Sequence, residues 1–140
     1  MNFQLSIKKF AQIIAVDSIS LEPDIFVSGV VYDTRKIFDG NGKVFFALQG
    51  KYRDGIAFVE EAYQKGIRVF VLDELPEVLQ HDAVYLKVDE PLDALMTLAR
   101  WHRNQFKIPV IAIIGTHGKT TIKEWLATLL KQNYQLVVFP

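Results

Sequence analysis

The sequence predicts an α/β fold: a small amino-terminal α/β domain, followed by the first strand, a glycine-rich loop and the first helix of a truncated parallel-sheet domain. Two observations support this prediction. Short apolar runs typical of buried strands alternate with segments whose apolar residues recur at helical spacing. Near the carboxyl end, the run Val-Ile-Ala-Ile-Ile at 110–114 leads into Gly-Thr-His-Gly-Lys-Thr-Thr and then into a helical pattern. Strands that alternate with helices form parallel sheets.

The first fifty residues predict one helix and two strands. Ser6 is a suitable N-cap for a helix over about residues 6–16. The β-branched stretch at 24–35 is typical of a strand that ends at the polar tripeptide Asp33-Thr34-Arg35. The short apolar run at 44–48 predicts a buried strand.

The next forty residues predict a helix and two further strands. Asp54 can serve as the N-cap of a helix, and Gly66 can end that helix. The segments at 67–72 and 83–88 have the length and the β-branched character of strands.

A longer helix separates these elements from the glycine-rich loop. Pro91 suits a first helical turn, and the apolar residues form one stripe until Pro109 ends the helix. We place a domain boundary at Asp89–Pro91, which divides the chain into domains 1–89 and 90–140.

The last segment follows the order strand, helix, strand. The runs at 110–114 and 135–139 predict two strands, and a helix is predicted from about Gly118 to Lys131. This order implies a parallel sheet with a crossover helix, and we expect its remaining strands to lie outside this chain.

The composition excludes several functional classes. Sixteen Lys and Arg residues balance sixteen Asp and Glu residues without a basic run, so the footprint of a nucleic-acid binder is missing. The absence of cysteine excludes disulfides and thiol chemistry. No apolar run approaches the ~18 residues that span a bilayer, and the start lacks the features of a signal peptide. The expected location is the cytoplasm.

The glycine-rich loop predicts a phosphate site. A loop between a buried strand and a helix N-terminus offers backbone N–H groups and a positive dipole end. Gly115 and Gly118 let an anion approach the backbone, Lys119 can reach the β and γ phosphates, and the Thr120 hydroxyl can bind Mg²⁺. The usual eight-residue pattern would need a glycine where Ile113 stands. The simpler alternative is a tight strand-to-helix connection with a solvated lysine.

The histidines need no catalytic role. We interpret His117 as a loop residue that shapes the turn, and His81 and His102 as surface residues without metal-ligand spacing. The full set of candidate ATP-phosphate ligands is Gly115, Thr116, His117, Gly118, Lys119, Thr120 and Thr121.

The loop sequence GTHGKTTIKEWL resembles the ATP-binding loop of the Mur ligases, the ATP-dependent amide-forming enzymes of peptidoglycan precursor synthesis. The first ninety residues resemble the amino-terminal domain of the two later ligases, which add the third residue and then D-alanyl-D-alanine. The matching pieces are YDTRKI, GKVFFALQG, KYRDGIAFVEEAYQKGIRVFVLDE and IPVIAIIG. The IKEWL segment is more similar to the ligase that adds D-alanyl-D-alanine, including forms fused to an alanine racemase.

The resemblance implies that the amino-terminal domain binds a UDP-muramoyl substrate. Thr34 stands where the family usually has the serine of an Asp-Ser-Arg motif, beside the uridine end. The family commonly has a histidine at the position of Ile56, so this chain departs from the family there and the resemblance implies no histidine contact. The candidate substrate-binding residues are Thr34, Arg35, Lys51, Tyr52, Arg53 and Asp54. The structural alternatives are that Asp54 is only an N-cap and that Arg35 forms a surface ion pair.

The reaction implied by the resemblance is ATP-driven amide formation. The terminal carboxylate of UDP-MurNAc-tripeptide would attack the γ-phosphate, and the amine of D-Ala-D-Ala would displace phosphate from the acyl phosphate. Lys119 is then the catalytic residue and Thr120 a Mg²⁺ ligand.

In the family the other metal ligands, the purine pocket and the amino-acid-binding domain lie beyond the loop. We therefore expect this chain alone to be inactive without the remainder of the ligase, and residues 109–140 to carry an unpartnered apolar face. Three alternatives stay open: a ligase for the third residue, a non-catalytic UDP-sugar-binding module, and an unrelated phosphate-loop NTPase.

Overall fold

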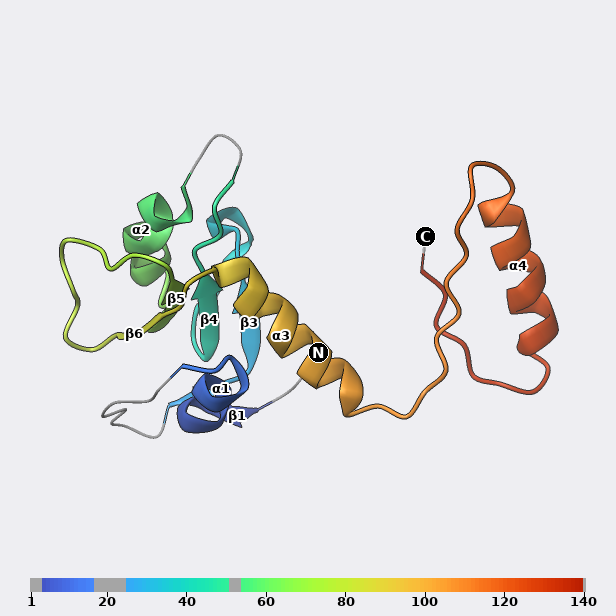
Figure 1. The fold of residues 1–140 in the computed structure, drawn as a ribbon, viewed down its shortest axis with the longest axis horizontal. Helices are drawn as coiled ribbons and strands as arrows, with labels where there is room; N and C mark the ends of the chain where they lie inside the picture. Colours follow the sequence, from blue (N-terminus) through green and yellow to red (C-terminus); the bar gives the residue numbers. More distant parts are fainter. Residues whose placement is uncertain (1–3, 17–24, 51–53, 140) are drawn as a thin grey trace. The chain divides into compact units, whose positions relative to one another are not determined.

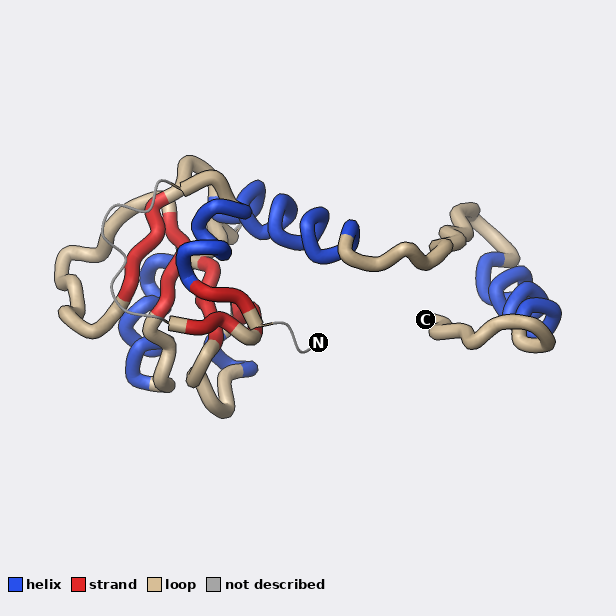
Figure 2. The backbone as a smooth tube through the Cα atoms, turned by 90° about the horizontal axis from the view of Figure 1, so that it is seen from below, coloured by secondary structure: helices blue, strands red, loops and turns tan. Residues whose placement is uncertain are grey.

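In the computed structural model, which describes residues 4–16, 25–50 and 54–139, the chain divides into two units, Met1–Phe106 and Lys107–Pro140. A parallel four-stranded sheet forms the centre of the first unit (Figures 1 and 2). Its strands lie side by side in chain order: β3 (Gly29–Val31), β4 (Lys43–Phe46), β5 (Val69–Leu72) and β6 (Val84–Lys87). This confirms the predicted α/β class.

The strands are apolar on both faces because both faces of the sheet are covered. Along β4, Val44 and Phe46 belong to one apolar core, whereas Phe45 belongs to the other. All four residues of β5 are buried. Such continuous apolar runs are characteristic of parallel strands between helical layers.

Helices α1 (Ile7–Ile13) and α3 (Pro91–Asn104), with the short antiparallel pair β1 (Leu5–Ser6) and β2 (Phe26–Val27), cover one face. Helix α2 (Val59–Gln64), preceded by the 3-10 helix η2 (Gly55–Phe58), covers the other face (Figure 2).

The helix ends follow the predicted capping residues. The Ser6 hydroxyl accepts a hydrogen bond from the Lys9 amide at 3.3 Å, and the Asp54 carboxylate accepts one from the Ile56 amide at 3.1 Å. Gly66 has φ +93°, the left-handed conformation in which glycine commonly terminates a helix. Asp54 precedes a 3-10 turn, so the α-helix itself begins only at Val59.

Helix α3 belongs to the first unit, so the division falls after Phe106 and not at the boundary predicted at 89–91. Ala94 and Leu98 are buried in the same core as Phe10 of α1. The longer helix whose start suggested a new domain therefore packs its apolar stripe against the amino-terminal unit.

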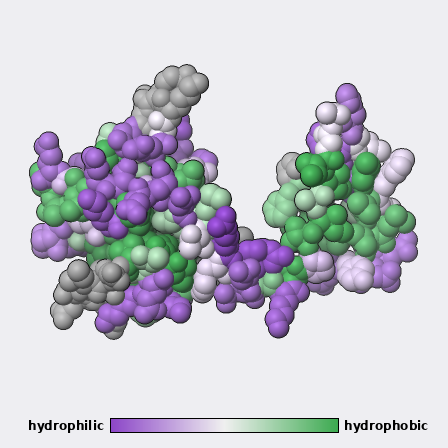
Figure 3. Space-filling model, viewed as in Figure 1, coloured by the Kyte–Doolittle hydropathy of each residue, from purple (hydrophilic) through white to green (hydrophobic). Residues whose placement is uncertain are grey.

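The second unit contains α4 (Lys119–Leu130), close to the helix predicted at 118–131. The strands predicted at 110–114 and 135–139 are not formed. A strand requires a neighbour to complete its hydrogen bonds, and within the described residues neither segment has one. No described residue of 107–139 is buried, and apolar side chains gather on the surface of this unit (Figure 3). This agrees with the expected unpartnered apolar face. Across the described ranges, no helix has the length and hydropathy to cross a membrane.

Candidate functional site

The turn that follows β3 is built around Asp33. Its carboxylate Oδ1 accepts a hydrogen bond from the Arg35 amide at 3.1 Å, which starts the 3-10 helix η1 (Thr34–Lys36). The Arg35 guanidinium donates back to the same carboxylate, from Nε to Oδ1 at 2.9 Å and from Nη2 to Oδ2 at 2.8 Å. The structural alternative for Arg35, a surface ion pair, is therefore present.

The pairing with Asp33 fixes the orientation of the exposed Arg35 guanidinium. The hydrogen bond from Arg35 is the main cause that lowers the pKa of Asp33 from 3.8 to about 2, and the same contact raises the pKa of Arg35. Asp33 uses two of the five N–H donors of the guanidinium. The Arg35 side chain is 86% exposed, so it can meet an anion while Asp33 holds its orientation.

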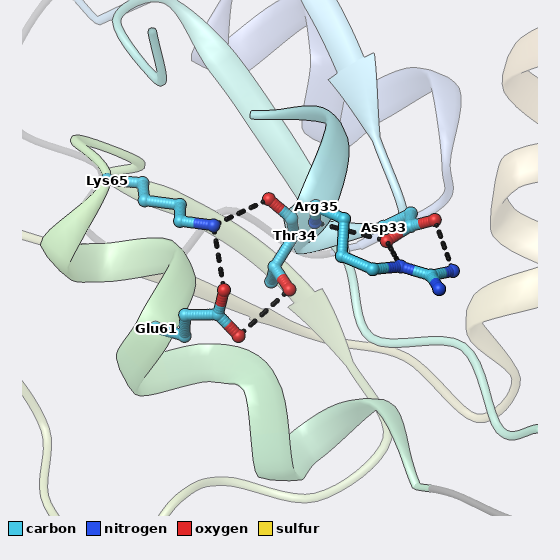
Figure 4. A network of polar contacts seen from close by, with 5 residues as sticks. All are labelled: Asp33, Thr34, Arg35, Glu61 and Lys65. Carbon is cyan, nitrogen blue, oxygen red and sulfur yellow. Dashed lines mark hydrogen bonds and ion pairs between the residues drawn. The ribbon is translucent and has the colours of Figure 1, made fainter. Parts of the chain in front are cut away.

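Thr34, the middle residue of the 33–35 turn, is only 4% exposed. Its hydroxyl donates to Glu61 Oε2 at 2.9 Å, and its carbonyl oxygen accepts from Lys65 Nζ at 2.9 Å (Figure 4). Lys65 also donates to Glu61 Oε1 at 2.7 Å. The Lys65 contact, followed by the Thr34 contact, lowers the pKa of Glu61. The predicted ligand-facing hydroxyl is thus engaged inside the protein.

Sequence reasoning missed Glu61 and Lys65. Their i, i+4 spacing, with Glu61 on α2 and Lys65 at its C-cap, was a detectable signal, but by itself such a pair indicates only a solvated helix face. Their contact with Thr34 depends on tertiary structure.

The second predicted substrate segment is only partly described. Lys51, Tyr52 and Arg53 lie outside the described residues, and Asp54 caps η2. A Cβ atom on Gly55 would lie 2.4 Å from the Ala47 carbonyl carbon, so this segment passes directly against the end of β4.

The 33–35 turn and the described end of the second segment, Asp54 and Gly55, therefore lie at one edge of the sheet. The 33–35 turn follows β3 and the 54–55 segment adjoins the end of β4, and these neighbouring strands run parallel. Gln49 and Asp73, which follow β4 and β5, are joined there by a 3.0 Å hydrogen bond. In open parallel sheets, ligands bind outside the carboxyl ends of the strands.

A hollow of about 300 Å³ lies near the start of β4 and β5, away from that edge. Arg68 and Asp82, which line it, form an ion pair at 2.8 Å, and the Tyr63 hydroxyl donates to Asp82 at 2.7 Å. Because these polar groups satisfy one another, the carboxyl edge is the stronger candidate site.

The glycine-rich loop has the backbone of an anion site. Gly118 has φ +75° and immediately precedes α4, whose first intrahelical bond runs from the Ile122 amide to the Gly118 carbonyl at 2.9 Å. The N–H groups of Lys119, Thr120 and Thr121 therefore lie at the unsatisfied helix end, and no side chain caps it. A Cβ on Gly118 would meet nothing within 4 Å, so the left-handed backbone alone requires glycine.

The side chains of this loop fit phosphates and a magnesium ion. Lys119 Nζ donates to the carbonyl oxygens of Gly115 and Thr116, which holds the ammonium above the loop. His117 Nδ1 lies 3.2 Å from the Thr116 hydroxyl, consistent with a role in shaping the turn. Thr120 offers one hydroxyl, and the described residues contain no group of three His, Asp or Glu that could hold a metal.

Comparison with known proteins identifies the relatives of this chain. It is 33% identical over 135 residues to the UDP-N-acetylmuramoyl-tripeptide–D-alanyl-D-alanine ligase of Synechocystis sp., covering 94% of this chain and 29% of that protein. It is 32% identical over 133 residues to the UDP-N-acetylmuramoyl-L-alanyl-D-glutamate–2,6-diaminopimelate ligase of Phocaeicola vulgatus, covering 94% of this chain and 26% of that protein. No protein-family model matches the chain.

Solved structures agree with these relatives. MurF from Acinetobacter baumannii superimposes with a TM-score of 0.76 at 26% identity, over 94% of this chain and 28% of that one. MurF ligase from Thermotoga maritima, in complex with ADP, gives 0.60 at 32% identity, over 74% of this chain and 23% of that one. Because its likeness to ligases of the MurF and MurE types extends over almost all of its residues, the chain is a homologue of the Mur ligases, and it spans less than a third of the length of these relatives.

Proposed function

We propose that this chain is part of an ATP-dependent ligase of peptidoglycan precursor synthesis, located in the cytoplasm, that joins D-Ala-D-Ala to UDP-MurNAc-tripeptide. The observation that carries the proposal is the combination, in one chain, of the 115–121 loop before α4 with a polar turn at the carboxyl edge of a parallel sheet. The likeness to two MurF structures and to a D-alanyl-D-alanine ligase supports this pairing.

In this proposal the second unit holds ATP. The amides that begin α4 and the Lys119 ammonium bind the phosphates, and the Thr120 hydroxyl is a ligand of Mg²⁺. ATP supplies the phosphoryl group that activates the substrate carboxylate. The contribution of Lys119 is to neutralise charge that develops on the transferred group.

The first unit carries the UDP-muramoyl substrate. Arg35 is an exposed cation at the described carboxyl edge, and a guanidinium suits a diphosphate. Lys51 and Arg53 would add charge from the neighbouring segment, and Tyr52 and Asp54 complete the proposed contact set. Thr34 contributes through the conformation of the turn that it anchors.

A second candidate function has specific support. The diaminopimelate ligase of P. vulgatus is nearly as similar to this chain as the Synechocystis enzyme. The proposed substrate would then be UDP-MurNAc-dipeptide and the added residue a single amino acid.

Calorimetric titration tests the substrate half of the proposal. The 140-residue protein is titrated with UDP-MurNAc-tripeptide and with UDP-MurNAc-dipeptide, as are Thr34→Ala and a Lys51→Ala/Arg53→Ala variant. We expect saturable binding that weakens in both variants, with a preference for the tripeptide. A preference for the dipeptide would support the alternative ligase, and no binding by a folded protein would overturn the assignment of the substrate to this unit.

A second titration tests the nucleotide half. Lys119→Ala is compared with Lys123→Ala, a lysine one helical turn later that donates to the Phe139 carbonyl at 3.2 Å. We expect ADP-Mg²⁺ binding to be lost in the first variant and kept in the second. Equal binding by both would leave the loop as a simple strand-to-helix connection.

A further inference from the structure

The turn that carries Asp33, Thr34 and Arg35 is held by Glu61 of α2 and by Lys65, the C-cap residue of that helix. Glu61 receives the Thr34 hydroxyl, and Lys65 binds the Thr34 carbonyl oxygen, which also accepts the Ile37 amide at 3.1 Å. Glu61 and Lys65 are bound to each other, so the two contacts form one closed unit with Thr34 (Figure 4). The middle residue of the turn is thereby tied through both its side chain and its backbone.

Arg35 lies on the other side of Thr34 from this pair (Figure 4). Its backbone amide and its guanidinium are both bound to Asp33, the residue that precedes Thr34. The orientation of the exposed guanidinium therefore depends on where the turn lies, and α2 fixes that position. The burial of Thr34 leaves almost no surface through which it could touch a ligand itself.

We propose that Glu61 and Lys65 are positioning residues for substrate binding: together with Thr34 they lock the 33–35 turn so that Arg35 meets the anionic part of the nucleotide-sugar. This rests on the proposed binding of a UDP-muramoyl substrate at the carboxyl edge. In this proposal, α2 and its C-cap not only cover the sheet but also orient the guanidinium of Arg35. A preorganised cation binds more tightly because less freedom is lost on binding.

The test measures binding of UDP-MurNAc-tripeptide by calorimetry to Glu61→Ala, Lys65→Met, Thr34→Val and Thr34→Ser. Glu60→Ala is the matched control, because Glu60 lies beside Glu61 but, among the described residues, accepts its side-chain hydrogen bond from Gln64 of the same helix, at 3.1 Å. Thermal unfolding of every variant verifies that it is folded. We expect Glu61→Ala, Lys65→Met and Thr34→Val to weaken binding about tenfold, the equivalent of one lost charge-assisted hydrogen bond. Thr34→Ser and Glu60→Ala should bind as the parent does.

Repeating the Glu61→Ala change in an Arg35→Gln variant separates positioning of Arg35 from general destabilisation of the protein. In Arg35→Gln the guanidinium is gone, so the further change Glu61→Ala should no longer weaken binding. The proposal is overturned if Glu61→Ala binds like the parent, or if its effect persists undiminished without Arg35. Absence of binding by the folded parent protein would overturn both the proposed substrate site and this inference. If only the inference is wrong, the parent protein still binds the substrate.

Discussion

At the scale of single residues, the Asp33–Arg35 pair makes a pH-dependent contact. The folded pKa of Asp33 is about 2, below its ordinary value of 3.8, because Arg35 donates hydrogen bonds to the charged form. The contribution of the pair to stability is therefore complete above about pH 4 and is lost as the pH falls toward 2. We expect a carboxyl NMR titration of Asp33 to show this low midpoint. Arg35→Gln should raise it toward 3.8, and Lys36→Gln, which removes only a minor cause, should change it little.

Gly55 should tolerate no side chain. A Cβ atom at this position would lie 2.6 Å from the Leu48 amide nitrogen as well as against Ala47, and backbone atoms cannot rotate away. Gly55→Ala should cost about 1–3 kcal/mol or more of unfolding free energy, measured by urea denaturation. Gly29→Ala is the control, because its nearest contact is the flexible Lys43 side chain at 3.4 Å. Equal midpoints for the two variants would contradict the close approach.

At the scale of elements, α3 presents a buried and an exposed leucine on one helix. Leu98 is 4% exposed in the core that contains Phe10, whereas Leu92 is 49% exposed. Leu98→Ala should lower the free energy of unfolding by about 2–5 kcal/mol, and Leu92→Ala by about 0.5 kcal/mol or less. A loss for Leu98→Ala as small as the loss for Leu92→Ala in urea unfolding would show that α3 does not belong to the amino-terminal core.

The elements show what local pattern can and cannot predict. The caps at Ser6 and Asp54 and the apolar runs of β4 and β5 were predictable, because capping and burial on both faces leave local marks in the sequence. The strand expected at 110–114 was not formed, because strand pairing depends on distant partners.

The candidate site likewise combines features that the local sequence predicts with features that depend on distant contacts. The backbone before α4 was predictable from Gly118, because a left-handed conformation at a helix start favours glycine, whereas phosphate binding by Lys119 stays a prediction. The contact between Thr34 and Glu61 was not predictable, since it joins residues on two elements that meet only in the folded chain.

At the scale of the whole molecule, the second unit exposes a large apolar surface. Its exposed apolar side chains include Ile114 (95%), Val137 (81%), Trp125 (69%) and Leu129 (66%). Surfaces of this kind promote association. We expect sedimentation velocity to show concentration-dependent self-association that weakens in Trp125→Ser/Leu129→Ser. Phe38→Ser, at a 98% exposed site in the first unit, should have no such effect. A monomer at every concentration would contradict the expectation.

The two layers on the sheet of the first unit also differ in when they can be completed during synthesis. The layer beneath α2 draws its core from residues between Val31 and Tyr85, so it can close once β6 has left the ribosome. The core of the opposite layer contains both Phe10 and Leu98, and all four strands of the sheet lie between these two residues in the sequence. This layer therefore cannot be completed until α3 has been synthesised. A nascent chain that ends after β6 therefore has one finished face and one open apolar face, and the emergence of α3 is the step that ends its exposure to aggregation.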